Sequence, residues 1–326
     1  MLKDKIISID ELSRFGQVST FNEQAETLIR YQRDTWPLAG KNYLEIQNIK
    51  KKTFDFEHCR IVTQFNPERL RSSAANTDTE SIAGRPCFLC LENLPEKQKG
   101  FLLLGKYLVL ANPYPIFPVH LTISDTSHVP QLIEGRLTDL LRISRELTNF
   151  IVFYNGPLCG ASAPDHFHFQ AAINGYMPIE NEISEKTSEP ITVSEKVKIS
   201  SSKNFLRRFI AIESKDKTAL TDQFGAIYRE LEKRNQNPEP MMNILCRFVE
   251  NKWQLIIFPR DKQRPCHFFL KDKNQIVVGP AAVELGGLMV LPRKEDFDKI
   301  TREKIVEIYK DVTINDRDFK KVISAF

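Results

Sequence analysis

The sequence of 326 residues lacks any run of about 18 consecutive apolar residues, the length that a membrane-spanning helix needs. The chain opens on Met1-Leu-Lys-Asp, and no apolar signal segment follows. We therefore expect no membrane association and a cytoplasmic protein.

An excess of charge of one sign is also missing. The formal net charge is +4 and no basic run stands out, so nothing here demands a nucleic-acid partner. This small positive charge suits an enzyme that handles anionic small molecules. Hydrophobic residues at 41% and charged residues at 27% are ordinary for a globular protein, and the length allows two modest domains or one large duplicated one.

Cysteine is scarce, and its placement favours a metal over a disulfide framework. Two of the six cysteines form the pair Cys87-Phe-Leu-Cys90, which fits a reducing compartment. Two thiolates at this spacing make half of a tetrahedral zinc site, and imidazole nitrogens complete such sites. The candidate partners are His120, His128 and His166. Redox use and a chance pair are the alternatives, but no thioredoxin-like strand-to-helix start is present.

The first half of the chain predicts a mixture of strands and a helix. Residues 1–80 mix short helical and extended patterns and end in a polar stretch, 71–80, that we expect to be a loop. Further along, short apolar runs and a helical spacing of leucines predict strands at 107–111, 120–123 and 151–154 and an amphipathic helix at 130–149.

A similar order returns after residues 179–203, which we interpret as an exposed connection because they are rich in Glu, Lys and Ser. We predict an α+β fold with an antiparallel sheet and flanking helices, duplicated as an N-terminal half, 1–178, and a divergent C-terminal half, 204–326. The second half lacks the histidine pair described next and keeps only His267. Its expected elements are strands at 209–212, 242–248, 253–258 and 288–291 and helices at 218–233 and 295–311.

The most informative stretch is Gly-Ala-Ser-Ala-Pro-Asp-His-Phe-His-Phe-Gln, residues 160–170. On a strand, alternate side chains share a face, so His166, His168 and Gln170 lie together while both phenylalanines enter the core. Such a row suits imidazoles held rigidly where chemistry occurs. The preceding Gly-Ala-Ser turn offers N–H groups and a hydroxyl to an anionic oxygen. An edge strand with incidental histidines is the alternative.

This stretch resembles the active-site strand of the histidine-triad superfamily. In the branch of galactose-1-phosphate uridylyltransferase, the diadenosine tetraphosphate phosphorylases and the GDP-hexose phosphorylases, the motif ends in Gln, as it does here. The resemblance runs from Arg85 to Ala172 and more weakly through the C-terminal third. It implies a duplicated fold on one continuous sheet, structural zinc, a nucleotide or nucleotide-sugar substrate, and inorganic phosphate as a second substrate. The oligomeric state, monomer or homodimer, stays open.

The resemblance also implies roles for individual residues. His168 would be the nucleophile, because a neutral imidazole whose other nitrogen is held by an acceptor can attack an α-phosphorus. Gln170 would donate to a phosphate oxygen, unless it is only a hydrogen-bonded strand residue. His120 would face the nucleotide pocket. The zinc ligands, carried over by position, would be Cys87, Cys90, His128 and His166.

Further positions match substrate contacts of that branch. Ser162, with Gly160 and Ala161, would contact the phosphate beyond the scissile bond. Asn155 would lie near the phosphates and Asn112 near the nucleoside, although both asparagines also fit simple turn formation. Arg260 and Glu284 resemble C-terminal positions of the tetraphosphate phosphorylases, where an arginine either pairs with phosphate or forms a surface ion pair.

The chain departs from the uridylyltransferase pattern at two positions. Asp165 and Phe167 stand where that enzyme has proline. This difference favours a nucleotidyltransferase of the phosphorylase type, in which phosphate accepts the nucleotidyl group. A nucleotide hydrolase and a non-catalytic, zinc-stabilised nucleotide-binding protein are the two alternatives.

Overall fold

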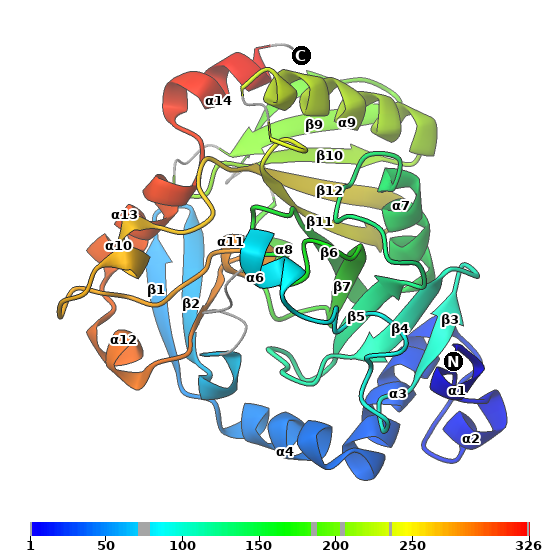
Figure 1. Ribbon diagram of the computed structural model, residues 1–326. Helices are drawn as coiled ribbons and strands as arrows, with labels where there is room; N and C mark the ends of the chain where they lie inside the picture. The colour runs from blue at the N-terminus through cyan, green and yellow to red at the C-terminus, as the bar shows by residue number, and fades with distance from the viewer. Residues whose placement is uncertain (1, 71–78, 184–187, 203–205, 235–236, 325) are drawn as a thin grey trace.

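Ten strands form one antiparallel sheet within the residues that the computed structural model describes, 2–70, 79–183, 188–202, 206–234, 237–324 and 326 (Figure 1). From one edge to the other, the strands are β3 (Gly100–Leu103), β4 (Tyr107–Ala111), β5 (His120–Asp125), β7 (His168–Ile173), β6 (Phe150–Asn155), β11 (Met242–Val249), β12 (Lys252–Pro259), β10 (Ile210–Ser214), β9 (Val197–Ser202) and β8 (Ser188–Val193).

The strand order confirms the predicted duplication. Read from each edge inward, the order is β3-β4-β5-β7-β6 on one side and β8-β9-β10-β12-β11 on the other, and the two sets join where β6 pairs antiparallel with β11. A helix follows the third strand of each set: α7 (Leu137–Glu146) after β5 and α9 (Lys217–Glu232) after β10. The chain therefore has the predicted α+β fold, with both halves on one continuous sheet.

Local sequence explains why the strands pair in this register. Glu250 and Asn251, between β11 and β12, have φ of 50° and 57°, as the two central residues of a tight hairpin turn require. On β7, Phe169 and Ala171 are buried in the same hydrophobic cluster as α7 and α9. His168 and Gln170 consequently point to the opposite face of the sheet.

A second, three-stranded sheet covers part of that opposite face. It contains β1 (Lys51–Phe56), β2 (Cys59–Phe65) and β13 (Leu288–Leu291), and β13 runs parallel to β2. A hydrophobic cluster that includes Ile61 and Phe258 fills the space between the two sheets. The site described below lies on this side of the large sheet.

The remaining helices pack around these two sheets, as Figure 1 shows. Of these, α3 contributes Leu28 to the same cluster as α7 and α9. The described helices are α1 (Leu2–Lys5), α2 (Ile9–Ser13), α3 (Phe21–Thr35), α4 (Pro37–Glu45), η1 (Ile46–Asn48), η2 (Pro67–Arg69), α6 (Thr79–Ala83), α8 (Ile179–Glu182), α10 (Cys266–Phe269), α11 (Ala282–Leu285), α12 (Lys294–Lys299), α13 (Arg302–Val312) and α14 (Asp316–Ile323).

Two predicted helices are shorter than expected. The helix predicted at 130–149 spans only Leu137–Glu146, because the chain before it turns through Gly135, whose φ is 71°. The helix predicted at 295–311 is two helices, α12 and α13. They separate at Ile300, after which Thr301 caps α13 by accepting a hydrogen bond from the Lys304 N–H.

Two further expectations about the chain need correction. The described part of residues 179–203 is not an exposed connection, because α8, β8 and β9 lie there and Ser200 and Ser201 are buried where β9 pairs with β10. His166 precedes β7 instead of lying on it, so it does not share the strand face of His168. The loop expected at 71–80 falls largely outside the described residues, although α6 begins at Thr79.

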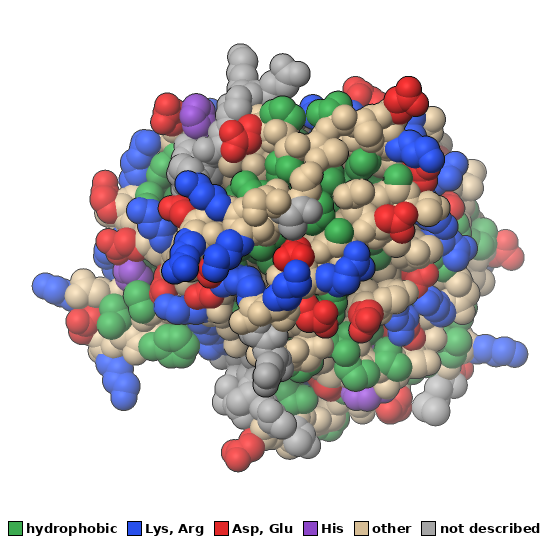
Figure 2. Space-filling view, turned by 90° about the horizontal axis from the view of Figure 1, so that it is seen from above, with side chains coloured by type: hydrophobic (Ala, Val, Ile, Leu, Met, Phe, Trp, Pro, Cys, Tyr) green, Lys and Arg blue, Asp and Glu red, His purple; other side chains and the backbone are tan. Residues whose placement is uncertain are grey.

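Within the described chain, no helix is long and apolar enough to cross a membrane. Basic and acidic side chains lie next to one another over the face shown in Figure 2. This mixture agrees with the small formal net charge of +4.

Candidate active site and metal centre

The four predicted metal ligands come together. One ligand atom from each of Cys87, Cys90, His128 and His166 lies within 4.8 Å of all the others. Nδ1 of His166 is 3.3 Å from Sγ of Cys87 and 3.5 Å from Sγ of Cys90, and Nδ1 of His128 is 3.2 Å from Sγ of Cys90. A tetrahedral zinc ion separates sulfur and nitrogen ligands by roughly 3.6 Å. This cluster can therefore hold a metal ion.

The environment of His166 prepares it as a ligand. Its Nε2 lies 2.8 Å from the backbone carbonyl of Asp125, so Nε2 carries the proton and Nδ1 presents a lone pair to the cysteines. Without a cation, burial and the neighbouring Cys87 thiol raise the pKa of Cys90 to about 12. A bound cation would therefore be needed to keep both cysteines in the thiolate form.

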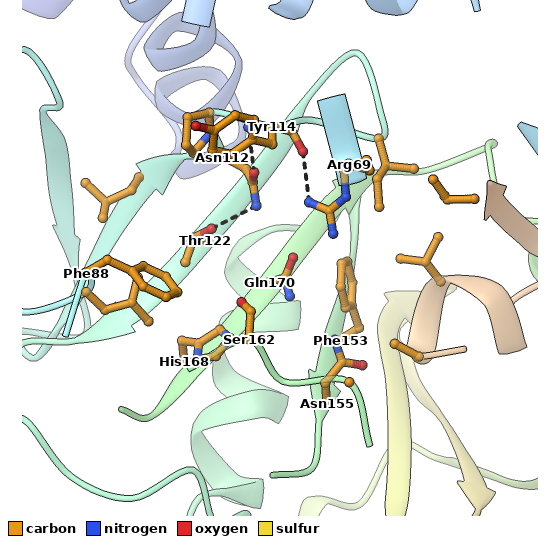
Figure 3. A pocket seen from close by; sticks show the side chains of 18 of the residues that line it. Arg69, Phe88, Asn112, Tyr114, Thr122, Phe153, Asn155, Ser162, His168 and Gln170 are labelled. Atoms are coloured by element: carbon orange, nitrogen blue, oxygen red, sulfur yellow. Dashed lines mark hydrogen bonds between the residues drawn. The ribbon is translucent and has the colours of Figure 1, made fainter. Parts of the chain in front are cut away.

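Beside the cluster lies a cavity of about 510 Å³, which is open to solvent and extends from the N-terminal half to α11 and β13 of the second half. In Figure 3, Phe88 and Arg69 lie on opposite sides, with Gln170 and Ser162 between them. The lining includes Trp36, Arg69, Arg85, Phe88, Leu89, Gln98, Leu110, Asn112, Thr122, Phe153, Asn155, Gly160, Ser162, His168, Gln170, Ala281 and Glu284.

One ring nitrogen of His168 donates a hydrogen bond, and the other keeps its lone pair. Its Nδ1 lies 2.9 Å from the backbone carbonyl of His166, and because a carbonyl only accepts, Nδ1 donates and Nε2 keeps its lone pair. Burial lowers the pKa of His168 to about 4, so the imidazole is neutral at neutral pH. Such an imidazole is a competent nucleophile.

Gln131, which the sequence did not reveal, fixes the backbone at His168. Its Oε1 accepts from the His168 N–H at 2.7 Å, and its Nε2 donates to the His168 carbonyl at 2.9 Å and to the Asn155 carbonyl at 3.0 Å. The buried hydroxyl of Tyr154 lies 3.0 Å from the Gln131 carbonyl and also contacts the carboxyl of Glu239. The start of β7 is therefore held by side-chain contacts from outside the strand.

His120 lies behind Gln170. The Ile116 N–H donates to Nδ1 of His120 at 3.2 Å, which leaves the proton on Nε2, and Nε2 lies 3.0 Å from Oε1 of Gln170. The Gln170 amide is thereby oriented with its NH2 group available to the cavity. Burial lowers the pKa of His120 to about 3. His120 is fully buried and does not itself line the cavity, so its contact with the cavity is through Gln170.

Asn155 is oriented in a similar way by the second half. Its Oδ1 accepts from Asn243 Nδ2 at 2.8 Å and from the Ala282 N–H at 2.9 Å, so its NH2 group is the free end. Arg260 donates to Asn243 at 2.5 Å and to the backbone carbonyls of Val312 and Pro280. Arg260 is buried away from the cavity, so the structure does not bring it to the place of a direct substrate contact.

The other predicted contact residues lie at or near the cavity wall. Asn112 lines it while also forming a turn, since its Oδ1 accepts from the Tyr114 N–H at 3.0 Å. Ser162 and Gly160 line it as well, whereas Ala161 is buried behind them. Gly160 has φ of 94°, and a Cβ there would lie 2.5 Å from the Cβ of Ala281. Only glycine fits this approach between the two halves.

Two cations of the cavity were missed by sequence reasoning. Arg69 donates to the Tyr114 carbonyl at 2.9 Å, and burial lowers its pKa to about 10, so it remains charged. Arg85 donates to the Ser162 carbonyl at 2.9 Å. No local signal marks either residue, because each reaches the cavity only through the tertiary fold. Glu284, by contrast, was noted from the sequence, and burial raises its pKa.

The chain combines a duplicated α+β fold with a Cys/His cluster that can hold a metal ion, beside a cavity lined by His168. Residues 28–173 match the family model named domain of unknown function DUF4922, and residues 179–325 match the GDPGP1-like C-terminal domain. No curated protein sequence matches the chain.

Solved structures of yeast Ap4A phosphorylase Apa2 share this fold. The complex with AMP has 16% sequence identity and a TM-score of 0.59, over 88% of this chain and 96% of that one. The complex with Ap4A has 15% identity and a TM-score of 0.60, over 88% and 97%. The likeness of the fold to a nucleotide phosphorylase structure agrees with the fold that the resemblance in the sequence implied.

Proposed function

We propose that this protein is a nucleotidyltransferase of the phosphorylase type, acting on a nucleoside polyphosphate or a nucleotide sugar through a covalent nucleotidyl-His168. The hydrogen bond from Nδ1 of His168 to the His166 carbonyl carries the proposal, because it leaves the Nε2 lone pair as the reactive atom. The likeness to a phosphorylase fold and to the GDPGP1-like domain supports the same class of enzyme.

In the first step, Nε2 of His168 attacks the α-phosphorus of the substrate. An N–P bond forms while the bond from this phosphorus to the bridging oxygen breaks, and the oxygen leaves with its electron pair as part of a phosphorylated product. The imidazole ring becomes cationic, and the His166 carbonyl that accepts from Nδ1 stabilises it. In the second step, an oxygen of inorganic phosphate attacks the same phosphorus and displaces the neutral imidazole, which gives a nucleoside diphosphate.

The surrounding groups stabilise charge on the phosphates. The NH2 groups of Gln170 and Asn155 are oriented toward donation by the partners of their oxygens. Arg69 and Arg85 supply positive charge at the cavity wall. We assign Ser162, with the Gly160 turn, to the phosphate beyond the scissile bond, and Asn112 to the nucleoside.

Zinc is the metal that the donor set of two thiolates and two imidazoles fits best, and we propose it as a structural ion. It would tie the Cys87–Cys90 turn to His166, two residues before His168. In that role it supplies no step of the reaction and instead fixes where the catalytic strand begins.

Product analysis tests the proposal. The purified protein would be incubated with a panel of nucleotide sugars and dinucleoside polyphosphates, with and without inorganic phosphate. We expect a nucleoside diphosphate only when phosphate is present. A nucleoside monophosphate formed equally well in both would indicate a hydrolase, and no product with any substrate would indicate a non-catalytic binding protein.

A further inference from the structure

Gln98 is a polar side chain of the cavity that the proposed reaction does not use. Gln98 lies on the segment between the Cys87–Cys90 turn and β3, is only 5% exposed, and lines the cavity together with Trp36 and Leu110. A polar group placed among apolar side chains usually serves recognition.

The orientation of the Gln98 amide is determined by its neighbour. Nε2 lies 3.2 Å from the backbone carbonyl of Ala111, which can only accept, so this atom is the NH2 group. Among the described residues, no donor reaches Oε1. The Gln98 oxygen is therefore the end of the amide that is available to a molecule in the cavity.

The backbone around Gln98 is held as firmly as the side chain. Gln32 of α3, which is fully buried, donates from Nε2 to the Lys97 carbonyl at 3.0 Å and accepts from the Lys99 N–H at Oε1, also at 3.0 Å. The Gln98 N–H donates to the Pro95 carbonyl at 3.0 Å. Such a preorganised acceptor loses little conformational entropy when a ligand binds.

This position suits the base of a nucleotide. Asn112 follows Ala111 directly and lines the same end, and Phe88 and Trp36 supply aromatic surface there. Figure 3 places Phe88 on the side away from Arg69, with Asn112 between Tyr114 and Thr122. A flat base that packs on this aromatic surface would direct its amino group, which projects beyond the ring edge, toward the Gln98 oxygen.

We infer that Gln98 is a specificity-determining residue that accepts a hydrogen bond from the exocyclic amino group of the nucleobase. The inference rests on the proposed function, because it requires a nucleotide in the cavity. The protein then favours amino-bearing bases over bases that present a carbonyl oxygen or a bare C–H at that place. A carbonyl there would face the lone pairs of Oε1, and a C–H would leave this buried acceptor unpaired.

Nucleoside monophosphates that differ by one amino group test the inference. The pairs are AMP with purine riboside 5′-monophosphate, GMP with IMP, and CMP with its 4-deamino analogue, and dissociation constants are measured by calorimetry. For the pair that contains the tightest ligand, we expect loss of the amino group to weaken binding about 10- to 100-fold in the wild type. In Gln98→Leu, this ratio should fall to near one.

Gln64→Leu is the matched control. Gln64 is also buried and also donates to a backbone carbonyl, that of Ile116, but it does not line the cavity. This variant should keep the wild-type ratio. A purely structural role of Gln98 predicts instead that Gln98→Leu weakens both members of each pair equally, and that result overturns the inference. If the wild type binds no nucleotide in the panel, the proposed function fails and the inference with it.

Discussion

Nε2 of His120 lies 3.0 Å from Oε1 of Gln170, and this contact decides which end of the Gln170 amide faces the cavity. A glutamine two residues after the nucleophile is useful only if it donates, since phosphate oxygens accept. His120 can enforce that orientation because its own Nδ1 is occupied by the Ile116 N–H.

Loss of His120 should therefore reduce turnover through Gln170. Replacing Gln170 with Ala removes one preorganised donor, which typically costs on the order of 10² to 10³ in kcat. His120→Phe should cost about 10-fold or more in kcat, with little change in KM. The double variant should be no slower than Gln170→Ala alone, because both changes remove the same interaction. Fully additive losses would show that His120 acts independently of Gln170.

Metal analysis should find about one zinc per chain, since Cys87, Cys90, His128 and His166 form one four-ligand site. Cys87→Ser and Cys90→Ser should lower the zinc content and the melting temperature, because the ion ties together segments about 80 residues apart. Cys266→Ser, at an exposed cysteine outside the cluster, is the control and should change neither. A metal-free protein with full activity and unchanged melting would remove the site from this account.

On the acidic side of its pH profile, kcat/KM should fall at an unusually low pH. Burial lowers the pKa of His168 to about 4, so its folded-state pKa lies below the ordinary histidine value of 6.5. The neutral, nucleophilic form then persists as the pH falls through 6 and is lost only near 4. Initial rates in buffers from pH 3.5 to 8 measure this limb. A fall in rate centred near 6.5 would mean that the reactive imidazole is not the buried one described here.

A buried carboxyl should make stability depend on pH. Glu239 has its pKa raised by burial from 4.5 to about 7. A raised carboxyl pKa favours the folded state below about 4.5, and this stabilisation is lost as the pH rises toward 7. At about 1.4 kcal/mol for each pKa unit, the loss is about 3 kcal/mol.

Urea unfolding at pH 5 and pH 8 tests this prediction. Glu239→Gln should flatten the loss of stability across that range, because an amide can accept from the Ile133 N–H and donate to Tyr154 at every pH. Glu146→Gln, at an exposed carboxylate of α7, should leave the wild-type pH dependence in place. If the free energy of unfolding changed equally between pH 5 and pH 8 in the wild type and in both variants, Glu239 would not be protonated in the folded protein.

The sequence predicted those site residues whose type and spacing are typical of one kind of site. It did not predict residues whose role depends only on the tertiary fold. The pair Cys87 and Cys90 indicated a metal site by its spacing, but only the family resemblance selected His128 and His166 from the three candidate histidines. The family resemblance assigned His120 and Arg260 to the substrate. The sequence carries no local mark that separates cavity-facing side chains from those behind them. Gln131 was invisible because its role depends on contacts with two strands.

In the fold as well, some elements were predictable from local sequence and others depend on tertiary contacts. Apolar periodicity located α9, and the structure buries one face of it, with Leu220, Phe224, Ile227 and Leu231. The strands β8 and β9 were missed because their sequences show little apolar alternation. They form because β9 pairs with β10 and β8 pairs with β9. The break between α12 and α13 depends on a threonine cap inside an otherwise helical pattern.

The most direct test of the central claim is a search for the covalent intermediate. The protein would be incubated with substrate in the absence of phosphate, and its intact mass and its peptides would then be measured. We expect one nucleotidyl group on the peptide containing residues 160–172, lost on addition of phosphate and absent in His168→Asn, which should still fold and bind nucleotide. An adduct on another residue, or turnover by His168→Asn above a few per cent of wild type, would contradict nucleophilic catalysis by His168 and indicate direct transfer to the acceptor.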